Sequence, residues 1–268
     1  MKLQAVSALA VFASSVTANF EKIQELFLQL EEAAYNKTIA DDPSLASDRG
    51  FSPFVLLYLQ DIQYYGCWCF LDDTWDQAKG PVQDGLDQEC KNLVMNYRCL
   101  VMDALDRGET CDPHSQDYTS YNLFGGSEQL VSECNEENKD PDDENKQCRI
   151  DLCIADGHFT LNLFALMFQQ GGIAASQPPY DPTMTHPNNA NAPGNFKPAD
   201  ECRYDYKGAG RSDKECCGAY PERFPFKTFN GDKACCNTAE GGRTFSTLSM
   251  QCCAGTPEVV VDINDPCP

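Results

Sequence analysis

The chain has 268 residues, a net charge of −21 at pH 7 and 16 cysteines. Such strong negative charge disfavours nucleic acid and anionic membrane surfaces as partners, and it favours cations, basic proteins or a cationic mineral surface. Acidity also keeps an extracellular protein dissolved, which is the simpler explanation of the same composition. Most of the excess negative charge lies before Gly172, so the two parts of the chain differ in charge.

The N-terminus has the features of a secretory signal peptide. Lys2 supplies a positive charge, Ala5–Ser15 an apolar segment, and small residues up to Ala18 a cleavage site. We therefore expect Met1–Ala18 to be removed and the protein to be secreted. No later apolar run has the roughly 18 residues that a membrane span needs. The best candidate, Phe159–Phe168, is too short, so we expect no transmembrane segment.

The cysteines of an exported chain are most simply read as disulfides. They lie at positions 67, 69, 90, 99, 111, 134, 148 and 153, and at 202, 216, 217, 235, 236, 252, 253 and 267. Two even sets predict two separately cross-linked domains, 19–171 and 200–268, joined by a linker over 172–199. A zinc site is disfavoured, because Cys67 and Cys69 are one residue short of the usual spacing.

Apolar residues at helical spacing predict an amphipathic helix over Asn19–Ala34. Asn36 begins an N-glycosylation sequon, which we place in the loop after this helix and expect to be glycosylated. A second apolar segment, Phe54–Ile62, leads into the first cysteines. The domain 19–171 is therefore expected to begin with helical structure.

The strongest helical pattern covers roughly Gln83–Leu105, and a partner helix is predicted over Cys148–Met167. In the first of these, seven residues fall on one stripe with steps of mostly three or four: Leu86, Cys90, Leu93, Val94, Tyr97, Val101 and Leu105. Leu93 and Val94 should therefore point inward. Burying each of these side chains stabilises a fold by about 1.5–3 kcal/mol.

The segment Tyr65-Gly66-Cys67-Trp68-Cys69 precedes this helix, which itself carries Asp87, Cys90 and Tyr97. This combination resembles the calcium loop and catalytic helix of the secreted phospholipase A2 family. The resemblance implies a mainly α, disulfide-rich lobe. It also puts Leu93 at the position of the catalytic histidine and Val94 at that of the calcium-binding aspartate. Because leucine accepts no proton and valine ligates no metal, we expect no enzymatic activity.

The resemblance also implies a disulfide pattern. The expected bridges are Cys69–Cys90, Cys111–Cys148 and Cys134–Cys153, and Cys67 and Cys99 are left over, with their pairing open. Two further family bridges lack both partners here, because Ala155 would face Asn96 and Asn162 would face Glu89. A small β-wing is also implied between Cys134 and Cys148.

Asp156 matches the family's aspartate that orients the catalytic histidine, and Tyr97 matches the tyrosine that holds it. Without that histidine, we expect a structural role for Asp156, with its carboxylate held by Tyr97 and by Tyr118 or Tyr121. A buried charge without such partners is costly. His158 is given no catalytic role.

Two groups of acidic residues are candidate calcium ligands. They are Asp72, Asp73 and Asp76 in the first loop, and Glu136, Glu137, Asp140, Asp142, Asp143 and Glu144 between Cys134 and Cys148. Oxygen-rich loops hold extracellular calcium weakly, at about 10⁻⁴–10⁻³ M. The alternative is that both groups are simply solvated. No other cofactor is expected.

Proline, glycine and asparagine dominate 172–199, so we expect neither helix nor strand in this linker. The segment 200–268 carries cysteine doublets at 216–217, 235–236 and 252–253. Adjacent cysteines on a strand face opposite sides, so each doublet can link its strand to two neighbours. We predict a small disulfide-rich β module with a hairpin over Phe224–Cys236 and a strand at Glu258–Val261. This module resembles the double-cysteine repeats of galaxin-type matrix proteins.

Three classes of function follow. The first is a non-enzymatic extracellular matrix or scaffold protein, associated with calcium or a mineral, of which the otoconins with their inactive phospholipase-like domains are an example. The second is a module that binds lipid or a receptor without hydrolysis. The third is a hydrolase that uses displaced residues. We prefer the first, in which matrix proteins, a mineral surface or a basic protein are the partners.

Overall fold

The computed structural model describes most of the helical part of the chain and the cysteine-rich C-terminal part. The described residues are 18–41, 62, 65–71, 75–82, 85–119, 126–169, 185–186, 189–193, 202 and 214–268. Several predictions therefore lie outside them: the signal peptide before Ala18, the apolar segment before Ile62, Asp72 and Asp73, and Tyr121.

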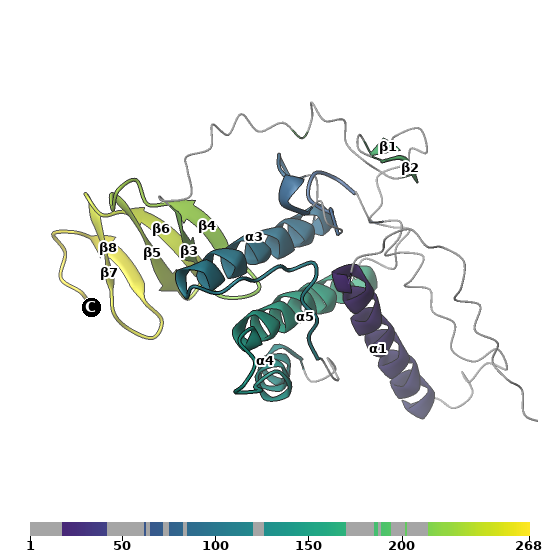
Figure 1. The fold of residues 1–268 in the computed structure, drawn as a ribbon. Helices are drawn as coiled ribbons and strands as arrows, with labels where there is room; N and C mark the ends of the chain where they lie inside the picture. The colour runs from purple at the N-terminus through teal and green to yellow at the C-terminus, as the bar shows by residue number, and fades with distance from the viewer. Residues whose placement is uncertain are drawn as a thin grey trace, which may run out of the picture.

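Two unlike regions make up the described chain (Figure 1). The first, here called the helical lobe (residues 18–169), contains α1 (Ala18–Asp41), the short 3-10 helix η2 (Trp75–Gln77), α3 (Gly85–Asp106), α4 (Gly126–Glu137) and α5 (Lys146–Gln169). The second, the doublet module (residues 214–268), contains β3 (Lys214–Cys217), β4 (Phe224–Lys227), β5 (Lys233–Thr238), β6 (Gly241–Ser246), β7 (Met250–Cys253) and β8 (Val259–Asp262). In Figure 1, α3 and α5 lie between α1 on one side and the paired strands of the doublet module on the other.

The centre of the helical lobe is the contact between α3 and α5, whose bounds lie within two residues of the predicted helices. Leu93, Val94 and Tyr97 are buried, as their spacing predicted. Leu105 is 41% exposed, so its predicted place in the core was wrong. Each step of four residues turns about 40° beyond a full turn. Two such steps lead from Tyr97 to Leu105, which is therefore rotated away from the side of the helix that faces the core.

The first helix is longer than predicted. α1 continues to Asp41, so Asn36 lies on this helix, where it is exposed, and its predicted place in a loop was wrong. The reason is that no glycine or proline interrupts the sequence before Pro43. None of the helices in the described part of the chain combines the length and the apolarity that a membrane span requires.

The region of the implied β-wing is helix and turn. Between Cys134 and Cys148 the chain completes α4, forms a turn-rich loop and begins α5, and these described residues contain no strand. The wing expected from the resemblance is therefore not formed there. The six carboxylates of this segment belong instead to the end of α4 and the loop after it.

The doublet module consists of three antiparallel strand pairs in chain order, β3 with β4, β5 with β6, and β7 with β8. The predicted hairpin over Phe224–Cys236 was wrong, because β4 and β5 are consecutive but belong to different pairs. The turn between them exists, with Phe229 and Asn230 at positive φ. Turn chemistry located the bend but could not decide which strands pair across it. The late strand was predicted within one residue, as β8.

The predicted linker also contains structure. β1 (Thr185–His186) pairs with β2 (Asn189–Pro193), so the expectation of no strand in 172–199 was wrong. An isolated two-stranded ribbon needs only local backbone hydrogen bonds. Pro193, which has no N–H to donate, lies in an edge strand, where proline is tolerated.

All cysteines form disulfides. Three bridges are those that the resemblance implied: Cys69–Cys90, Cys111–Cys148 and Cys134–Cys153. Cys67 and Cys99, however, bond to Cys202 and Cys216. The expectation of two separately cross-linked domains was therefore wrong, because two bridges join the two cysteine sets.

The remaining bridges link successive doublets. They are Cys217–Cys235, Cys236–Cys252 and Cys253–Cys267. The second cysteine of each doublet thus bonds to the first cysteine of the next doublet or to Cys267. The expected role of a doublet, to link its strand to two neighbours, is confirmed, with α3 as one neighbour of the first doublet.

Candidate functional site

The positions that the resemblance assigns to a catalytic base and a metal ligand lie in the apolar core. Leu93 and Val94 are each 1% exposed and belong to one cluster with Ala155 and Phe159 of α5. The helical period places them there, since they share a face of α3 with Cys90 and Tyr97. Neither side chain can exchange a proton or bind a cation.

Next to these positions is a buried carboxyl group. Asp156 of α5 is fully buried. Its Oδ1 accepts a hydrogen bond of 2.5 Å from the Tyr97 hydroxyl, and its Oδ2 accepts one of 2.8 Å from the Tyr118 hydroxyl. The prediction that tyrosines hold Asp156 is confirmed, with Tyr118 as the second partner.

The surroundings of this group change its acidity. Burial raises the pKa of Asp156 to about 7, although the hydrogen bonds from Tyr97 and Tyr118 oppose this shift. Burial and the neighbouring Asp156 raise the pKa of Tyr118 well above its usual value. The carboxyl group is therefore partly protonated near neutral pH, and it is shielded from bulk solvent. Its arrangement suits a structural polar contact in a dry core.

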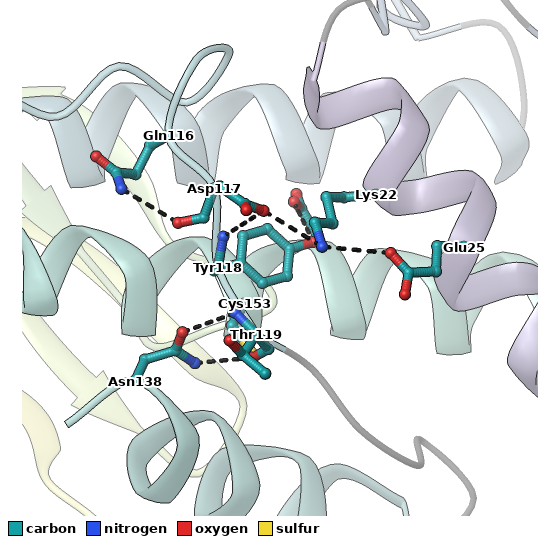
Figure 2. Close-up of polar contacts among 9 residues, drawn as sticks. Lys22, Glu25, Gln116, Asp117, Tyr118, Thr119, Asn138 and Cys153 are labelled. Atoms are coloured by element: carbon teal, nitrogen blue, oxygen red, sulfur yellow. Dashed lines mark hydrogen bonds and ion pairs between the residues drawn. The ribbon is translucent and has the colours of Figure 1, made fainter. Parts of the chain in front are cut away.

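Tyr118 is positioned by contacts with two other elements (Figure 2). Lys22 of α1 forms an ion pair of 3.2 Å with Asp117, next to Tyr118. On the other side, the Asn138 side chain accepts from the backbone N–H of Thr119 and donates to its carbonyl, both at 2.8 Å. The tyrosine is thereby held between α1 and Asn138, the residue that follows α4.

A second buried acid anchors the loop before α3. Asp87 is fully buried, and its Oδ1 accepts from the backbone N–H groups of Cys67 and Trp68 at 3.0 and 2.8 Å. Gly66 has φ +58°, and a Cβ at this position would lie 2.4 Å from the Asp87 carboxyl group. Sequence reasoning used Asp87 only to align the motif. Its place in the first turn of a helix that follows a glycine loop is the signal that predicts such an anchor.

Three of the four positions of the two missing family bridges make polar side-chain contacts. Asn162 of α5 donates a hydrogen bond of 3.0 Å to Glu89 of α3, so these two positions do face each other. Asn96 instead faces the doublet module: its side chain donates to the Pro221 carbonyl at 2.8 Å and accepts from the Arg223 N–H at 3.2 Å. Sequence reasoning did not predict this contact between the two regions.

Further contacts join α3 to the doublet module. Asp103 accepts two hydrogen bonds from the Arg223 guanidinium, and Cys99 bonds to Cys216. Together with Asn96 these residues are three and four positions apart, on one face of α3. This face is distinct from the one that carries Leu93 and Tyr97, so α3 connects the two regions.

The acidic residues proposed for calcium are dispersed where the structure describes them. Asp76 is exposed, and so are Glu136, Glu137, Asp140, Asp142 and Glu144. Asp143 is instead paired with Arg149, and Glu136 with Lys139. Among the described residues, only Cys236, Cys252 and Glu258 bring three candidate ligand atoms together, and the two cysteines are bonded to each other. The calcium site stays a prediction.

His158 is in the interior of α5 with 5% of its surface exposed, and burial lowers its pKa. It is therefore neutral at pH 7 and has little access to water.

Comparison with known proteins gave no match to a family model, to a curated protein or to a solved structure. What this chain does must then be inferred from its own residues.

Proposed function

We propose that this chain is a secreted, non-enzymatic extracellular matrix or scaffold protein, whose helical lobe is a phospholipase A2-like domain without catalysis. The observation that carries the proposal is the pair Leu93 and Val94, buried in the core beside Asp156, whose two oxygens are both engaged by tyrosines. Hydrolysis by water needs a base within reach of the substrate and a charge that stabilises the oxyanion. Neither is supplied at these positions.

Two further observations support the proposal. Eight disulfides and no free cysteine fit an oxidising, extracellular setting. The contact of Asn162 with Glu89 is the second, because the resemblance predicts that these two positions face each other. Replacing both by cysteine should then give a ninth disulfide, detected by mass spectrometry after thiol labelling. A free thiol at both positions would argue against the phospholipase-like packing of α3 and α5.

The partner in this proposal is a cationic surface, either a calcium mineral or a basic protein. The loop after α4 supports this, because Asp140, Asp142 and Glu144 are exposed and have no ion pair with a described residue. Multiple exposed carboxylates on one loop attract multivalent cations through their summed field.

Two assays of the full secreted chain test the proposal. The first measures fatty acid release from phospholipid vesicles in millimolar calcium, with an active phospholipase as positive control; release should stay at the background rate. Measurable turnover that the chain itself causes would overturn the proposal. Co-sedimentation with the vesicles without turnover would indicate lipid binding instead of a matrix role.

The second assay measures adsorption to calcium carbonate crystals. The variant with Asp140→Asn, Asp142→Asn and Glu144→Gln should adsorb less than the parent chain. A matched control neutralises three exposed carboxylates of the doublet module: Glu240→Gln, Asp262→Asn and Asp265→Asn. Equal losses in both variants would show that net charge, and not this loop, directs adsorption.

A further inference from the structure

One face of α3 gathers positive charge in a strongly acidic protein. Lys91, Met95 and Arg98 are four and three positions apart, so they share a face of the helix. This face differs from the one that packs on α5 and from the one that carries Asn96 and Cys99 towards the doublet module. It is therefore the third side of α3.

This face lines a cleft of about 590 Å³. The loop before α3 forms one wall with Trp68 and Lys79, and strands β3 and β4 form another with Lys214 and Pro225. We call it the cationic cleft, because Lys79, Lys91, Arg98 and Lys214 line it, and Asp76 is the one acidic residue among the described residues of its lining. Its volume is in the range of sites that hold small organic ligands, which is about 300–1,000 Å³.

The cations of this cleft are held in place but poorly neutralised. The Lys91 ammonium and the Arg98 guanidinium lie 5.4 and 5.5 Å from the ring centre of Trp68. Arg98 also donates to two backbone carbonyls, those of Asp76 at 3.2 Å and Ala78 at 2.7 Å. These partners orient the guanidinium without cancelling its charge.

Among the described residues, no carboxylate lies within ion-pair distance of Lys79, Lys91 or Arg98. The chain has 41 acidic residues for 20 lysines and arginines, so a cleft whose described lining carries more basic than acidic residues is unusual for it. Like charges near one aromatic ring repel each other, and an anion placed between them relieves that repulsion.

We propose that the cationic cleft binds a small organic anion with two or more carboxylate, phosphate or sulfate groups. The anionic groups would lie between Lys79, Lys91 and Arg98, and the carbon frame would pack on Met95 and Pro225. A compact ligand fits better than an anionic polymer. A polymer would extend past the cleft and meet the rest of a surface with a net charge of −21. For a ligand inside the cleft, the nearest charges are the positive ones of the lining. The acidic charges elsewhere on the surface are more distant, and salt screens their effect over about 8 Å.

Calorimetric titration of the full chain with citrate and with pyrophosphate, without calcium, tests this inference. Binding of at least one of the two in the millimolar range or tighter is expected, and it should weaken with added salt. The variant Lys79→Gln with Lys91→Gln should bind about tenfold more weakly or worse. Lys146→Gln removes one exposed lysine at the start of α5 and should leave binding unchanged.

A fluorescence titration gives a second reading. The chain has only two tryptophans, so the Trp75→Phe variant reports on Trp68 alone. Because two cations lie over the Trp68 ring, ligand binding between them should change its emission, and in Lys79→Gln with Lys91→Gln this change should be lost. Arg98 is kept in both experiments, because its contacts with the loop support the fold.

Several outcomes would overturn the inference. One is that neither anion binds at about 10 mM, roughly tenfold above the expected millimolar range. Another is that the parent chain and the Lys79→Gln, Lys91→Gln variant bind equally. Tighter binding of long heparin chains than of citrate and pyrophosphate, abolished by the same variant, would show a polymer site instead. None of these results bears on hydrolysis or on mineral adsorption, so this inference and the proposed function can fail separately.

Discussion

The helical lobe and the doublet module are both cross-linked by disulfides, but they differ in how many apolar residues they bury. The helical lobe has a continuous buried cluster that extends from Phe20 of α1 to Leu163 of α5. Within residues 214–268 the buried apolar residues are Phe226 and three cysteines, Cys217, Cys236 and Cys253. In the first region disulfides supplement a core, whereas in the second they replace one. Small exported modules that cannot bury enough apolar surface are commonly stabilised in this way.

This difference predicts that polar substitution in the core of the helical lobe has the largest effect. Leu93→His with Val94→Asp puts two polar groups, without partners, at positions that are 1% exposed. The free energy of unfolding of the helical lobe should fall by about 5 kcal/mol. Urea unfolding followed by helical circular dichroism measures it.

The control for this experiment lies on the same helix. Leu105→His changes a residue that is 41% exposed and should cost less than about 0.5 kcal/mol. A loss below about 1 kcal/mol in the double variant would contradict the account of a dry core between α3 and α5. Hydrolytic activity should not appear in either variant.

The next effect is a pH dependence confined to the helical lobe. Asp156 has its pKa raised from 3.8 to about 7, so between these values the folded state binds more protons than the unfolded state. The contribution of Asp156 to the free energy of unfolding should then decrease as pH rises from about 4 to about 7, by on the order of 4 kcal/mol. Above this range the contribution is constant.

Asp156→Asn isolates this contribution. Because other carboxylates also titrate, the stability of the variant is compared with that of the parent chain at each pH. The difference should shift in favour of Asp156→Asn as pH rises from 4.5 to 8. Amide exchange in β5–β8 should be the same in both proteins. A difference that does not depend on pH would contradict the raised pKa.

Loss of one disulfide should have different effects on amide exchange in the two regions. Cys236–Cys252 and Cys134–Cys153 close loops of nearly equal length, with separations of 16 and 19 residues. Replacing either pair by serine should therefore cost a similar free energy, about 3 kcal/mol. Without Cys236–Cys252, however, strands β5–β8 should lose their protection from amide exchange, because little apolar burial remains there.

Without Cys134–Cys153, α5 should stay protected by the core. Exchange measured by mass spectrometry on peptides from both regions gives the comparison. If β5–β8 retained protection in the first variant, the module would have a source of stability other than its disulfides. Loss of protection in α5 in the second variant would instead mean that the core alone cannot hold this helix.

The smallest predicted effect concerns the contact between the regions. Asn96 is 1% exposed and binds the backbone of Pro221 and Arg223, so Asn96→Ala removes the side-chain partner of a partly buried carbonyl and N–H. The cost should be about 2 kcal/mol, read from the unfolding of the doublet module. Asn92→Ala is the control, because Asn92 bonds only to Gln88 of its own helix in the contacts observed. Equal effects of the two variants would mean that Asn96 does not couple the regions.

Local patterns predicted much of the helical lobe. The helical period identified α1, α3 and α5 and placed Leu93 and Val94 inside, because the side of a helix on which a residue lies depends only on its neighbours along the chain. The same rule failed at Leu105, where steps of four residues drift off the core. α4 was not predicted, and the wing implied in its place is absent from the described residues.

Pairing over long distances could not be predicted in the same way. Turn residues at 230–232 located a bend, yet β4 pairs with β3, and β5 with β6. Cys67 and Cys99 bond to cysteines more than 100 residues away. Many pairings are compatible with one set of cysteines, so spacing does not select among them.

The sequence by itself determined the helical segments, the apolar character of the two altered positions and the need for many disulfides. Only the tertiary structure decided the surroundings of the three sides of α3. One side packs in the core with α5, one contacts the doublet module, and one lines the cationic cleft. Lys79, Lys91, Arg98 and Lys214 show the reason. Lys91 and Arg98 share a face of α3 by their helical spacing, but Lys79 and Lys214 come from other parts of the chain, and only folding brings all four charges to one place, where their fields add.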